Sequence, residues 1–267
     1  MAERYAVIGN PVAHSKSPWI HAAFARQTRQ DMAYERIEAP LDGFARTVDS
    51  FRAAGGRGAN VTVPFKEQAF QYCGNAVTER AVAAGVVNTL VFDDGRVRGD
   101  NTDGVGLLRD ITVNLGRAIA GRRVLLMGAG GAAQGVVGPL LSAGPRQLVV
   151  ANRTAGKARA LAHRYGAASG GGYDELGGAQ FDLLINATSA GLAGEAPPLA
   201  TGAFAAGALG YDMVYGRDTP FLMLARTAGA AASDGLGMLV EQAAESFRLW
   251  RGIAPDARAV LAALRAG

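Results

Sequence analysis

The chain has 267 residues, which is enough for two domains of ordinary size, and 49% of them are hydrophobic, so that a large core can form. Its formal net charge of +4 is mildly basic, but the basic residues are interspersed and form no dense run, which argues against nucleic acid as a partner. The excess of positive charge favours small anionic ligands instead.

The first part of the chain alternates predicted strands with predicted helices. Hydrophobic periodicity predicts strands over 4–9, 32–39 and 58–64, helices over 17–28 and 41–55, a hairpin within 86–103 that turns at residues 94 and 95, and a helix over 103–116. This order indicates an N-terminal α/β domain.

A second series of strands and helices begins near residue 122. A strand, a glycine-rich turn and a helix are expected over 122–144, a strand over 147–154, a helix over 155–166, strands within 181–191 and 208–215, and a long amphipathic helix over 237–255. Right-handed crossovers make such a sheet parallel and doubly wound, as in the Rossmann fold. The glycine-rich residues 166–178 are expected to form a surface connection.

The stretch "VLLMGAGGAAQG" carries a dinucleotide-binding pattern. Gly128 permits a tight turn, Gly130 lets the backbone approach a pyrophosphate, and Ala133 allows close packing of helix on strand. The helix that begins near Gly131 presents free N–H groups to phosphate. The alternative is a tight turn without a ligand, but the strand before it, the helix after it and the second strand beyond make the nucleotide site the stronger interpretation.

The end of the second strand distinguishes NADP from NAD. An NAD site usually has Asp or Glu there to bind the ribose 2′-hydroxyl, whereas this chain has Asn152, Arg153 and Thr154. Arg153 can bind a 2′-phosphate, and Lys157 adds positive charge one turn later. The alternative is that Arg153 is a solvated side chain at the start of a helix.

Polar side chains gather at the end of the predicted strand 58–64. If Val61 and Val63 face the core, then Asn60 and Thr62 share the other face, because side chains alternate along a strand. Pro64 should end the strand and place Lys66 in the first turn of a following helix. A polar group at the carboxyl end of a strand predicts a substrate site, the alternative being a solvated edge with a surface lysine.

Three further motifs present polar side chains. In "HSKSPW", Ser15 and Ser17 lie at a helix N-terminus, which favours a carboxylate, although Ser17 could simply be the N-cap. Asn88 follows buried valines in "VVNT". Asp103 in "GDNTDG" precedes a helix, where it is either a functional carboxylate or an N-cap.

Taken together, the motifs resemble those of the shikimate dehydrogenase family. They are "NPVAHSKSP", "GANVTVPFKE", "AGVVNTL", "GDNTDG", "GAGGAA", "NRT", "INATSAG", "YDMVY" and "DGLGMLVEQAA", in order, over residues 5 to about 250. The resemblance implies NADPH-dependent reduction of 3-dehydroshikimate to shikimate. It also implies a discontinuous substrate domain (1–103 and 239–267) and a Rossmann NADP domain (104–238), with the C-terminal helix returning to the first domain.

The resemblance also implies residue roles by motif position. Lys66 and Asp103 would be the catalytic pair. The substrate ligands would be Ser15, Ser17, Thr62, Lys66, Asn88, Asp103 and Gln242, with Tyr215 nearby. The polar end of the strand 58–64 adds Asn60 to this set. Cofactor contacts would be Glu79, Gly128, Ala129, Gly130, Gly131, Ala132, Asn152, Arg153, Thr154, Lys157, Met213 and Gly235.

Other interpretations are less well supported by the sequence. A quinate/shikimate dehydrogenase that uses NAD is disfavoured by the absence of an acidic residue in "NRT", and a non-catalytic NADP-binding sensor by the presence of Lys66 and Asp103. The single cysteine, Cys73, allows no internal disulfide, and the three histidines lack metal-ligand spacing. Without a secretory segment or an apolar run of transmembrane length, we expect a cytoplasmic monomer or homodimer with no membrane partner and no metal.

Overall fold

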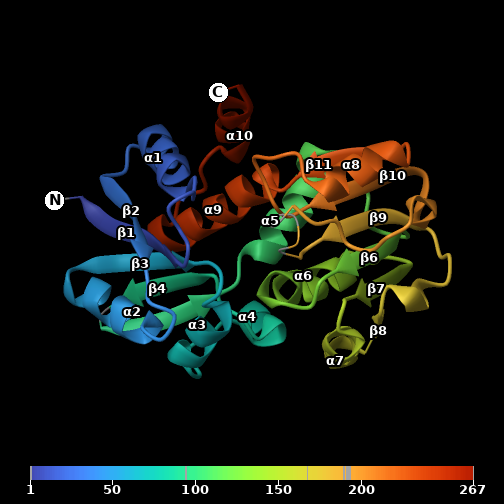
Figure 1. The fold of residues 1–267 in the computed structure, drawn as a ribbon. Coiled ribbons are helices and arrows are strands. Elements are labelled where there is room, and N and C mark those ends of the chain that lie inside the picture. The colour runs from blue at the N-terminus through green and yellow to red at the C-terminus, as the bar shows by residue number, and fades with distance from the viewer. Residues whose placement is uncertain (1, 94, 167, 189, 191–193, 267) are drawn as a thin grey trace. The chain divides into compact units, whose positions relative to one another are not determined.

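A computed structural model of the chain describes residues 2–93, 95–166, 168–188, 190 and 194–266. The chain divides into two compact units, which are coloured by residue number in Figure 1. Unit 1 combines Met1–Gly106 with Leu239–Gly267, and unit 2 is the continuous stretch Leu107–Met238. Unit 1 is therefore assembled from two segments that are far apart in the sequence.

The strands of unit 1 form one mixed sheet in the order β2-β1-β3-β4-β5. β1 pairs in parallel with β2 and β3, whereas β3, β4 and β5 pair antiparallel. The predicted hairpin of β4 and β5 is confirmed. Between these strands, Gly95 has φ +77°, a left-handed conformation that glycine adopts without strain. Asp94 lies outside the described residues. The strand bounds are β1 Glu3–Gly9, β2 Met32–Glu38, β3 Gly56–Val61, β4 Thr89–Asp93 and β5 Arg96–Asp100.

Helices cover both faces of this sheet (Figure 1). One face packs an apolar core against α2, α3 and α4, in which Phe44 and Phe65 are fully buried. On the other face, Phe24 of α1 and Phe247 of α9 meet with ring centroids 5.8 Å apart. The helix bounds are α1 Ser17–Thr28, α2 Phe44–Ala53, α3 Lys66–Cys73, α4 Glu79–Ala84, α5 Asp103–Arg109, α9 Leu236–Arg251 and α10 Ala257–Ala266; α5 and α9 each continue across a boundary between the units.

The strands of unit 2 form a parallel sheet in the order β11-β10-β9-β6-β7-β8. The chain starts at β6, moves outward to β7 and β8, and then returns to β9 on the other side of β6. This is the doubly wound order of dinucleotide-binding domains, and it places a topological switch point between β6 and β9. The strand bounds are β6 Arg123–Met127, β7 Gln147–Ala151, β8 Ser169–Gly171, β9 Phe181–Asn186, β10 Phe204–Asp212 and β11 Ala231–Asp234.

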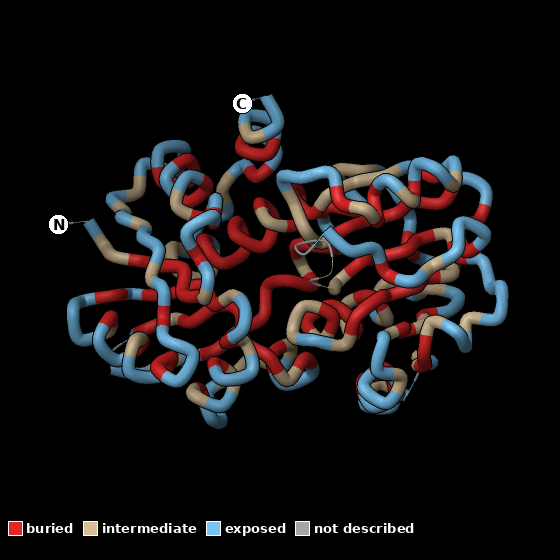
Figure 2. The backbone as a smooth tube through the Cα atoms, viewed as in Figure 1, coloured by how far each residue is buried: buried red, intermediate tan, exposed pale blue. Residues whose placement is uncertain are grey.

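Two apolar cores flank the parallel sheet. One packs against α6 (Gly131–Ser142) and α7 (Ala155–Tyr165), and the other against α8 (Pro220–Thr227). The helix predicted over 103–116 continues beyond α5 as a π-helical turn at Asp110–Asn114. In each unit the inner strands, such as β1, β3, β6 and β9, are mostly buried, and α9 is buried along most of its length, whereas the edge strands β2 and β11 and the outward side of α7 are more exposed (Figure 2). Within the described residues, no helix is both long enough and apolar enough to cross a membrane.

Two expectations about local structure are wrong. β3 ends at Val61 rather than at residue 64, and the Val63 side chain is 53% exposed instead of facing the core, because the chain turns before Pro64 and buries Phe65 in its place. The glycine-rich stretch is not only a connection, because it contains β8, which pairs with β7. A Cβ at Gly170 of β8 would overlap the α7 backbone at Ala158, so glycine lets this edge strand approach the helix closely.

Candidate functional site

Ser15 and Ser17 lie together at the N-terminal end of α1. Both are buried, and their hydroxyl oxygens are 3.2 Å apart. α1 begins at Ser17, so Lys16 occupies the N-cap position and the interpretation of Ser17 as a simple cap is wrong. Arg36 of β2 holds the loop in place, because its guanidinium donates hydrogen bonds of 2.9 and 2.5 Å to the Ser15 carbonyl. Two hydroxyls, a helix N-terminus and a nearby cation form a suitable environment for a carboxylate.

Asn60 is buried at the end of β3 and its amide is used within the protein. Its Nδ2 donates to the Asn88 carbonyl at 3.3 Å, the Thr89 hydroxyl at 3.2 Å and the Ser246 hydroxyl at 2.9 Å. Its Oδ1 accepts a bond of 2.8 Å from the Tyr34 hydroxyl. Asn60 therefore ties β2, β4 and α9 together beneath the polar surface.

Lys66 and Asp103 form a close ion pair. Lys66 Nζ lies 2.5 Å from Asp103 Oδ2, and the two side chains are only 14% and 6% exposed. Asn88 donates from Nδ2 to Asp103 Oδ1 at 2.8 Å, so each carboxylate oxygen has a donor. As predicted, Lys66 is in the first turn of a helix, since α3 begins at this residue. The carboxylate of Asp103 bonds to side chains outside its own helix, so Asp103 is not merely an N-cap.

A hydroxyl and amide cluster surrounds this pair. Asn88 Oδ1 accepts from the Thr102 N–H at 2.8 Å, and its Nδ2 lies 3.4 Å from Gln242 Oε1 on α9. Ser246, also on α9, bonds to Thr89 at 2.9 Å. Thr62 is half-buried just beyond β3, and its backbone N–H donates to Ile8. The structure thus brings all of the predicted substrate residues of unit 1 to the polar end of one sheet.

His21 lies behind the serine pair and is fully buried. Its ring stacks on Tyr34 with centroids 4.2 Å apart, and within the described residues neither ring nitrogen makes a hydrogen bond that satisfies the distance and angle limits. Burial lowers the pKa of His21 from 6.5 to about 3, and the nearby amide of Asn60 opposes this shift only in part. The imidazole is therefore neutral at physiological pH.

In unit 2, the glycine turn after β6 has the geometry that a dinucleotide requires. Gly128 has φ +110°, and a Cβ at this position would lie 3.0 Å from the Ala187 carbonyl oxygen after β9. A Cβ at Gly130 would meet open space, so the backbone is accessible there. α6 begins at Gly131, as predicted, and Ala133 is fully buried against the sheet. The predicted group of Gly128, Ala129, Gly130, Gly131 and Ala132 therefore forms one turn at the switch point of the sheet.

Basic side chains follow β7 at the same edge of the sheet. Arg153 and Lys157 are exposed, and Thr154 precedes α7. The Asn152 amide donates to the Thr154 carbonyl at 3.0 Å, which fixes the shape of this loop. The guanidinium of Arg153 and the ammonium of Lys157 therefore lie in solvent after the end of β7.

Two other predicted cofactor residues lie at the ends of β10 and β11. Met213 follows β10, and a Cβ at Gly235 would come within 2.5 Å of the Met213 carbonyl oxygen, so the close approach of these two segments requires glycine. Tyr215 is half-buried in unit 2, whereas the other predicted substrate ligands are in unit 1. Glu79 is exposed at the start of α4 in unit 1, whereas the other predicted cofactor contacts are in unit 2.

Several site residues were missed from the sequence. Tyr34 and Arg36 alternate along β2, and their spacing of two residues was a usable sign that both point to one face. Thr102 lies within the quoted motif "GDNTDG", from which only Asp103 was selected. Ser246 reaches the site from the C-terminal helix across a separation of 186 residues from Asn60, and no local pattern reveals such a contact.

Models of known families match three parts of the chain. Residues 7–90 match the shikimate dehydrogenase substrate binding domain, residues 111–193 match shikimate / quinate 5-dehydrogenase, and residues 235–265 match the shikimate 5'-dehydrogenase C-terminal domain. The first and second matches fall in different structural units, and the third begins shortly before the chain returns to unit 1.

Individual relatives are similar over nearly the whole chain. Shikimate dehydrogenase (NADP(+)) of Nitrosospira multiformis is 60% identical, over 99% of this chain and 98% of the relative, and that of Dechloromonas aromatica is 58% identical, over 100% and 98%. Among solved structures, shikimate 5-dehydrogenase from Thermus thermophilus in complex with NADP(H) and shikimate has a TM-score of 0.89 and 36% identity, over 99% of both chains. A 5-ketofructose reductase of Gluconobacter has a TM-score of 0.83 and 28% identity, over 100% of this chain and 99% of that one. The chain belongs to the shikimate dehydrogenase family.

Proposed function

We propose that this protein reduces 3-dehydroshikimate to shikimate with NADPH, and catalyses the reverse oxidation with NADP. The observation that carries the proposal is the buried pair of Lys66 and Asp103, held by Asn88 at the polar end of the unit 1 sheet. Such a pair can exchange a proton with a ketone or alcohol oxygen, which is the requirement of a carbonyl reductase.

The serine pair is proposed to bind the carboxylate of the substrate. Ser15 and Ser17 can donate hydroxyl hydrogen bonds to the two carboxylate oxygens, and the start of α1 adds the favourable end of the helix dipole. Because Arg36 fixes the Ser15 carbonyl, the hydroxyls are held in place before the substrate binds. Thr62, Asn88 and Gln242 are proposed to bind the ring hydroxyls.

Lys66 is proposed to supply the proton. NADPH, when bound, provides the hydride that adds to the carbonyl carbon. The carbonyl oxygen then becomes negative, and the Lys66 ammonium stabilises it and donates a proton to it, giving the secondary alcohol. Asp103 holds the ammonium toward the substrate, and in the reverse direction neutral Lys66 accepts the hydroxyl proton.

Unit 2 has the features that NADP binding requires. The open backbone at Gly130 and the free N–H groups of the first turn of α6 suit the pyrophosphate. Arg153 is proposed to bind the 2′-phosphate with two N–H groups at once, assisted by Lys157. Met213 and Gly235 are proposed to line the nicotinamide end.

Asn60, Tyr215 and Glu79 differ from the other predicted site residues. The amide of Asn60 bonds to Tyr34 and Ser246, whereas that of Asn88 bonds directly to Asp103 of the reactive pair, so we propose that Asn60 supports the site rather than binding the substrate. The contacts of Tyr215 with substrate and of Glu79 with cofactor stay predictions, as do the cytoplasmic location and the monomeric or homodimeric state.

The test is a substrate and cofactor matrix with the purified protein. Shikimate and quinate are each offered with NADP and with NAD, and the absorbance of reduced nicotinamide is followed. We expect the highest kcat/KM for shikimate with NADP. Because a structural neighbour is a 5-ketofructose reductase, 5-ketofructose with NADPH is included in the reductive direction. Turnover that is faster with quinate and NAD, or with 5-ketofructose, would reassign the substrate, and cofactor binding without any turnover would point to a sensor.

A further inference from the structure

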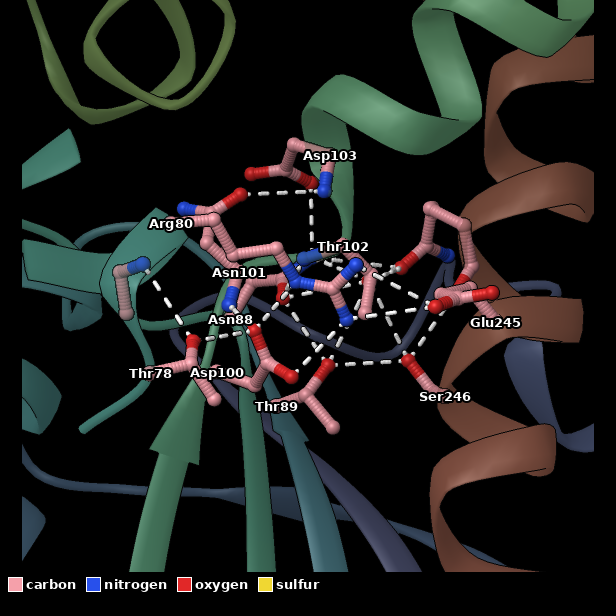
Figure 3. A network of polar contacts seen from close by, with 12 residues as sticks. Thr78, Arg80, Asn88, Thr89, Asp100, Asn101, Thr102, Asp103, Glu245 and Ser246 are labelled. Atoms are coloured by element: carbon pink, nitrogen blue, oxygen red, sulfur yellow. Dashed lines mark hydrogen bonds and ion pairs between the residues drawn. The ribbon is translucent and has the colours of Figure 1, made fainter. Parts of the chain in front are cut away.

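A cluster of ion pairs belongs to the same polar network of unit 1 as Asp103 (Figure 3). The guanidinium of Arg80, on α4, binds Asp100 with two bonds, of 2.5 Å from Nε and 2.9 Å from Nη2. The same guanidinium lies 3.2 Å from a carboxylate oxygen of Glu245 on α9. The side chains of Asp100 and Glu245 are only 4% and 3% exposed. One cation therefore joins two buried carboxylates from different parts of the chain.

The Asp100 carboxylate is also linked, through Asn101, to the reactive residue Asp103. Its Oδ1 accepts a bond of 2.7 Å from the backbone N–H of Asn101. The Asn101 side chain in turn accepts from the N–H of Asp103 at 3.1 Å and donates to the Val86 carbonyl at 3.1 Å. A continuous path of hydrogen bonds thus runs from Arg80 through Asp100 and Asn101 to the first residue of α5 (Figure 3).

A second path reaches the other donor of the catalytic carboxylate. The backbone N–H of Asn88 donates to the Asp100 carbonyl at 3.0 Å, and the Asn88 side chain bonds to Asp103. Asp100, which binds Arg80, therefore fixes both the start of α5 and Asn88, whose side-chain amide orients Asp103. A shift of Asp100 would move both supports at once.

The charge balance of the cluster depends on Arg80. Burial acts to lower the pKa of Arg80, but its hydrogen bond to Asp100 and the charges of both carboxylates outweigh burial and raise it. Arg248 also binds Glu245, at 2.7 Å, but its side chain is 47% exposed. Loss of Arg80 would leave Asp100 as a buried carboxylate without this cation, and an uncompensated buried charge is strongly unfavourable.

We propose that Arg80 is a positioning residue for the reaction, which acts through Asp100 and Asn101 to hold Asp103 in the geometry needed by Lys66. The proposal rests on the proposed function, because it concerns the catalytic pair. Misplacement of a reacting group by about 1 Å can cost up to about a hundredfold in rate. The Arg80 guanidinium bonds to Asp100 and Glu245, both in unit 1, so we expect its loss to leave the intrinsic binding of NADP unchanged.

The test compares Arg80→Ala and Arg80→Lys with Arg248→Ala as the matched control. For Arg80→Ala we expect kcat to fall about ten- to a hundredfold, with the dissociation constant for NADP unchanged within about twofold. Arg80→Lys keeps a charge but loses the planar fork, so we expect a loss of about three- to tenfold. Arg248→Ala should keep kcat within about twofold. Guanidinium ions at low millimolar concentration should raise the kcat of Arg80→Ala at least about threefold. They should have no effect on the kcat of Arg248→Ala.

Thermal melts show whether each variant is folded, and only the kinetics of folded variants are interpreted. If Arg80→Ala does not fold, Arg80→Lys carries the test. A folded Arg80 variant with the kcat of the unmodified enzyme would overturn the proposal, as would an equal loss in Arg248→Ala that guanidinium does not relieve, since that indicates general loosening. Absence of turnover in the unmodified protein would refute the proposed function instead, and is recognised before any variant is made.

Discussion

Replacement of Lys66 by alanine tests the centre of the proposed mechanism. The side chain of Asp103 is 6% exposed, and its two oxygens are bound by Lys66 and Asn88. In Lys66→Ala the proton donor is gone, and we expect kcat to fall by about two orders of magnitude, which is typical of a lost general acid or base. KM should change much less, because the serine pair that is proposed to bind the carboxylate is untouched.

The same variant should also lose stability. Removal of one partner from a buried ion pair costs about 3–5 kcal/mol, because the other charge stays buried without compensation. Asp103→Asn combined with Lys66→Ala removes that charge, so urea denaturation should show the double variant to be more stable than Lys66→Ala alone. Its kcat should be no lower than that of the worse single variant, since the two groups act as a unit.

The measurements separate catalysis from folding. Steady-state kinetics with shikimate and NADP give kcat and KM, and urea denaturation gives the free energy of unfolding. A folded Lys66→Ala enzyme with kcat within about threefold of the unmodified enzyme would refute the role of Lys66. If the two single variants are additive in kcat, Lys66 and Asp103 do not act as a pair.

Three further predictions concern the carboxylate, the cofactor and acid stability. Ser15→Ala should raise KM for shikimate about tenfold or more, through loss of a bond to a charged group, while NADP binding and the melting temperature stay close to their original values; an unchanged KM contradicts the carboxylate subsite. Arg153→Ala should weaken NADP binding about tenfold or more and NAD binding only a few-fold, with an effect that shrinks as salt rises. The exposed Arg146, before β7 at the other end of that strand, is the control, and equal losses for both nucleotides in Arg153→Ala would mean that it does not bind the phosphate. His21 has a pKa lowered from 6.5 to about 3, so the unfolded chain binds a proton there that the folded chain does not, and stability is present above pH 6.5 and falls as the pH drops toward 3. Urea denaturation should show this contribution as a loss of about 1.4 kcal/mol between about pH 8 and about pH 5.5 that disappears in His21→Phe and persists in the control His163→Gln; the same pH slope in His21→Phe would assign the loss to other groups.

Local patterns were sufficient for the regular parts of the fold. α1 was predicted with its observed bounds because Pro18 and the apolar spacing mark both its start and its buried face. The start of α6 at Gly131 followed from the glycine turn. β8 was missed because its three residues, Ser169–Gly171, are an edge strand without apolar alternation, whose pairing is decided by neighbours. Val63 was misplaced because a continuing strand and a turn before proline share the same alternating pattern.

The reactive residues were found by motif, but their support was not. Lys66 follows the polar end of a predicted strand, and Asp103 lies in the motif "GDNTDG" before a predicted helix. The residues that hold them make contacts over long sequence separations, such as Arg80 with Glu245, which are 165 residues apart. Such contacts depend on how the sheet and the C-terminal helix pack, and single-sequence periodicity contains no information about that packing.

The return of the chain to unit 1 has a consequence for synthesis. Asn60 bonds to Ser246, and Trp250 donates to the Leu90 carbonyl at 2.9 Å, so α9, near the end of the chain, packs on the sheet that was made first. Unit 2 is continuous and ends at Met238, whereas unit 1 lacks these partners until the nascent chain is almost finished. On the ribosome, the whole of unit 2 is therefore made while unit 1 still waits for its final segment, which reverses the usual order in which the N-terminal domain is completed first.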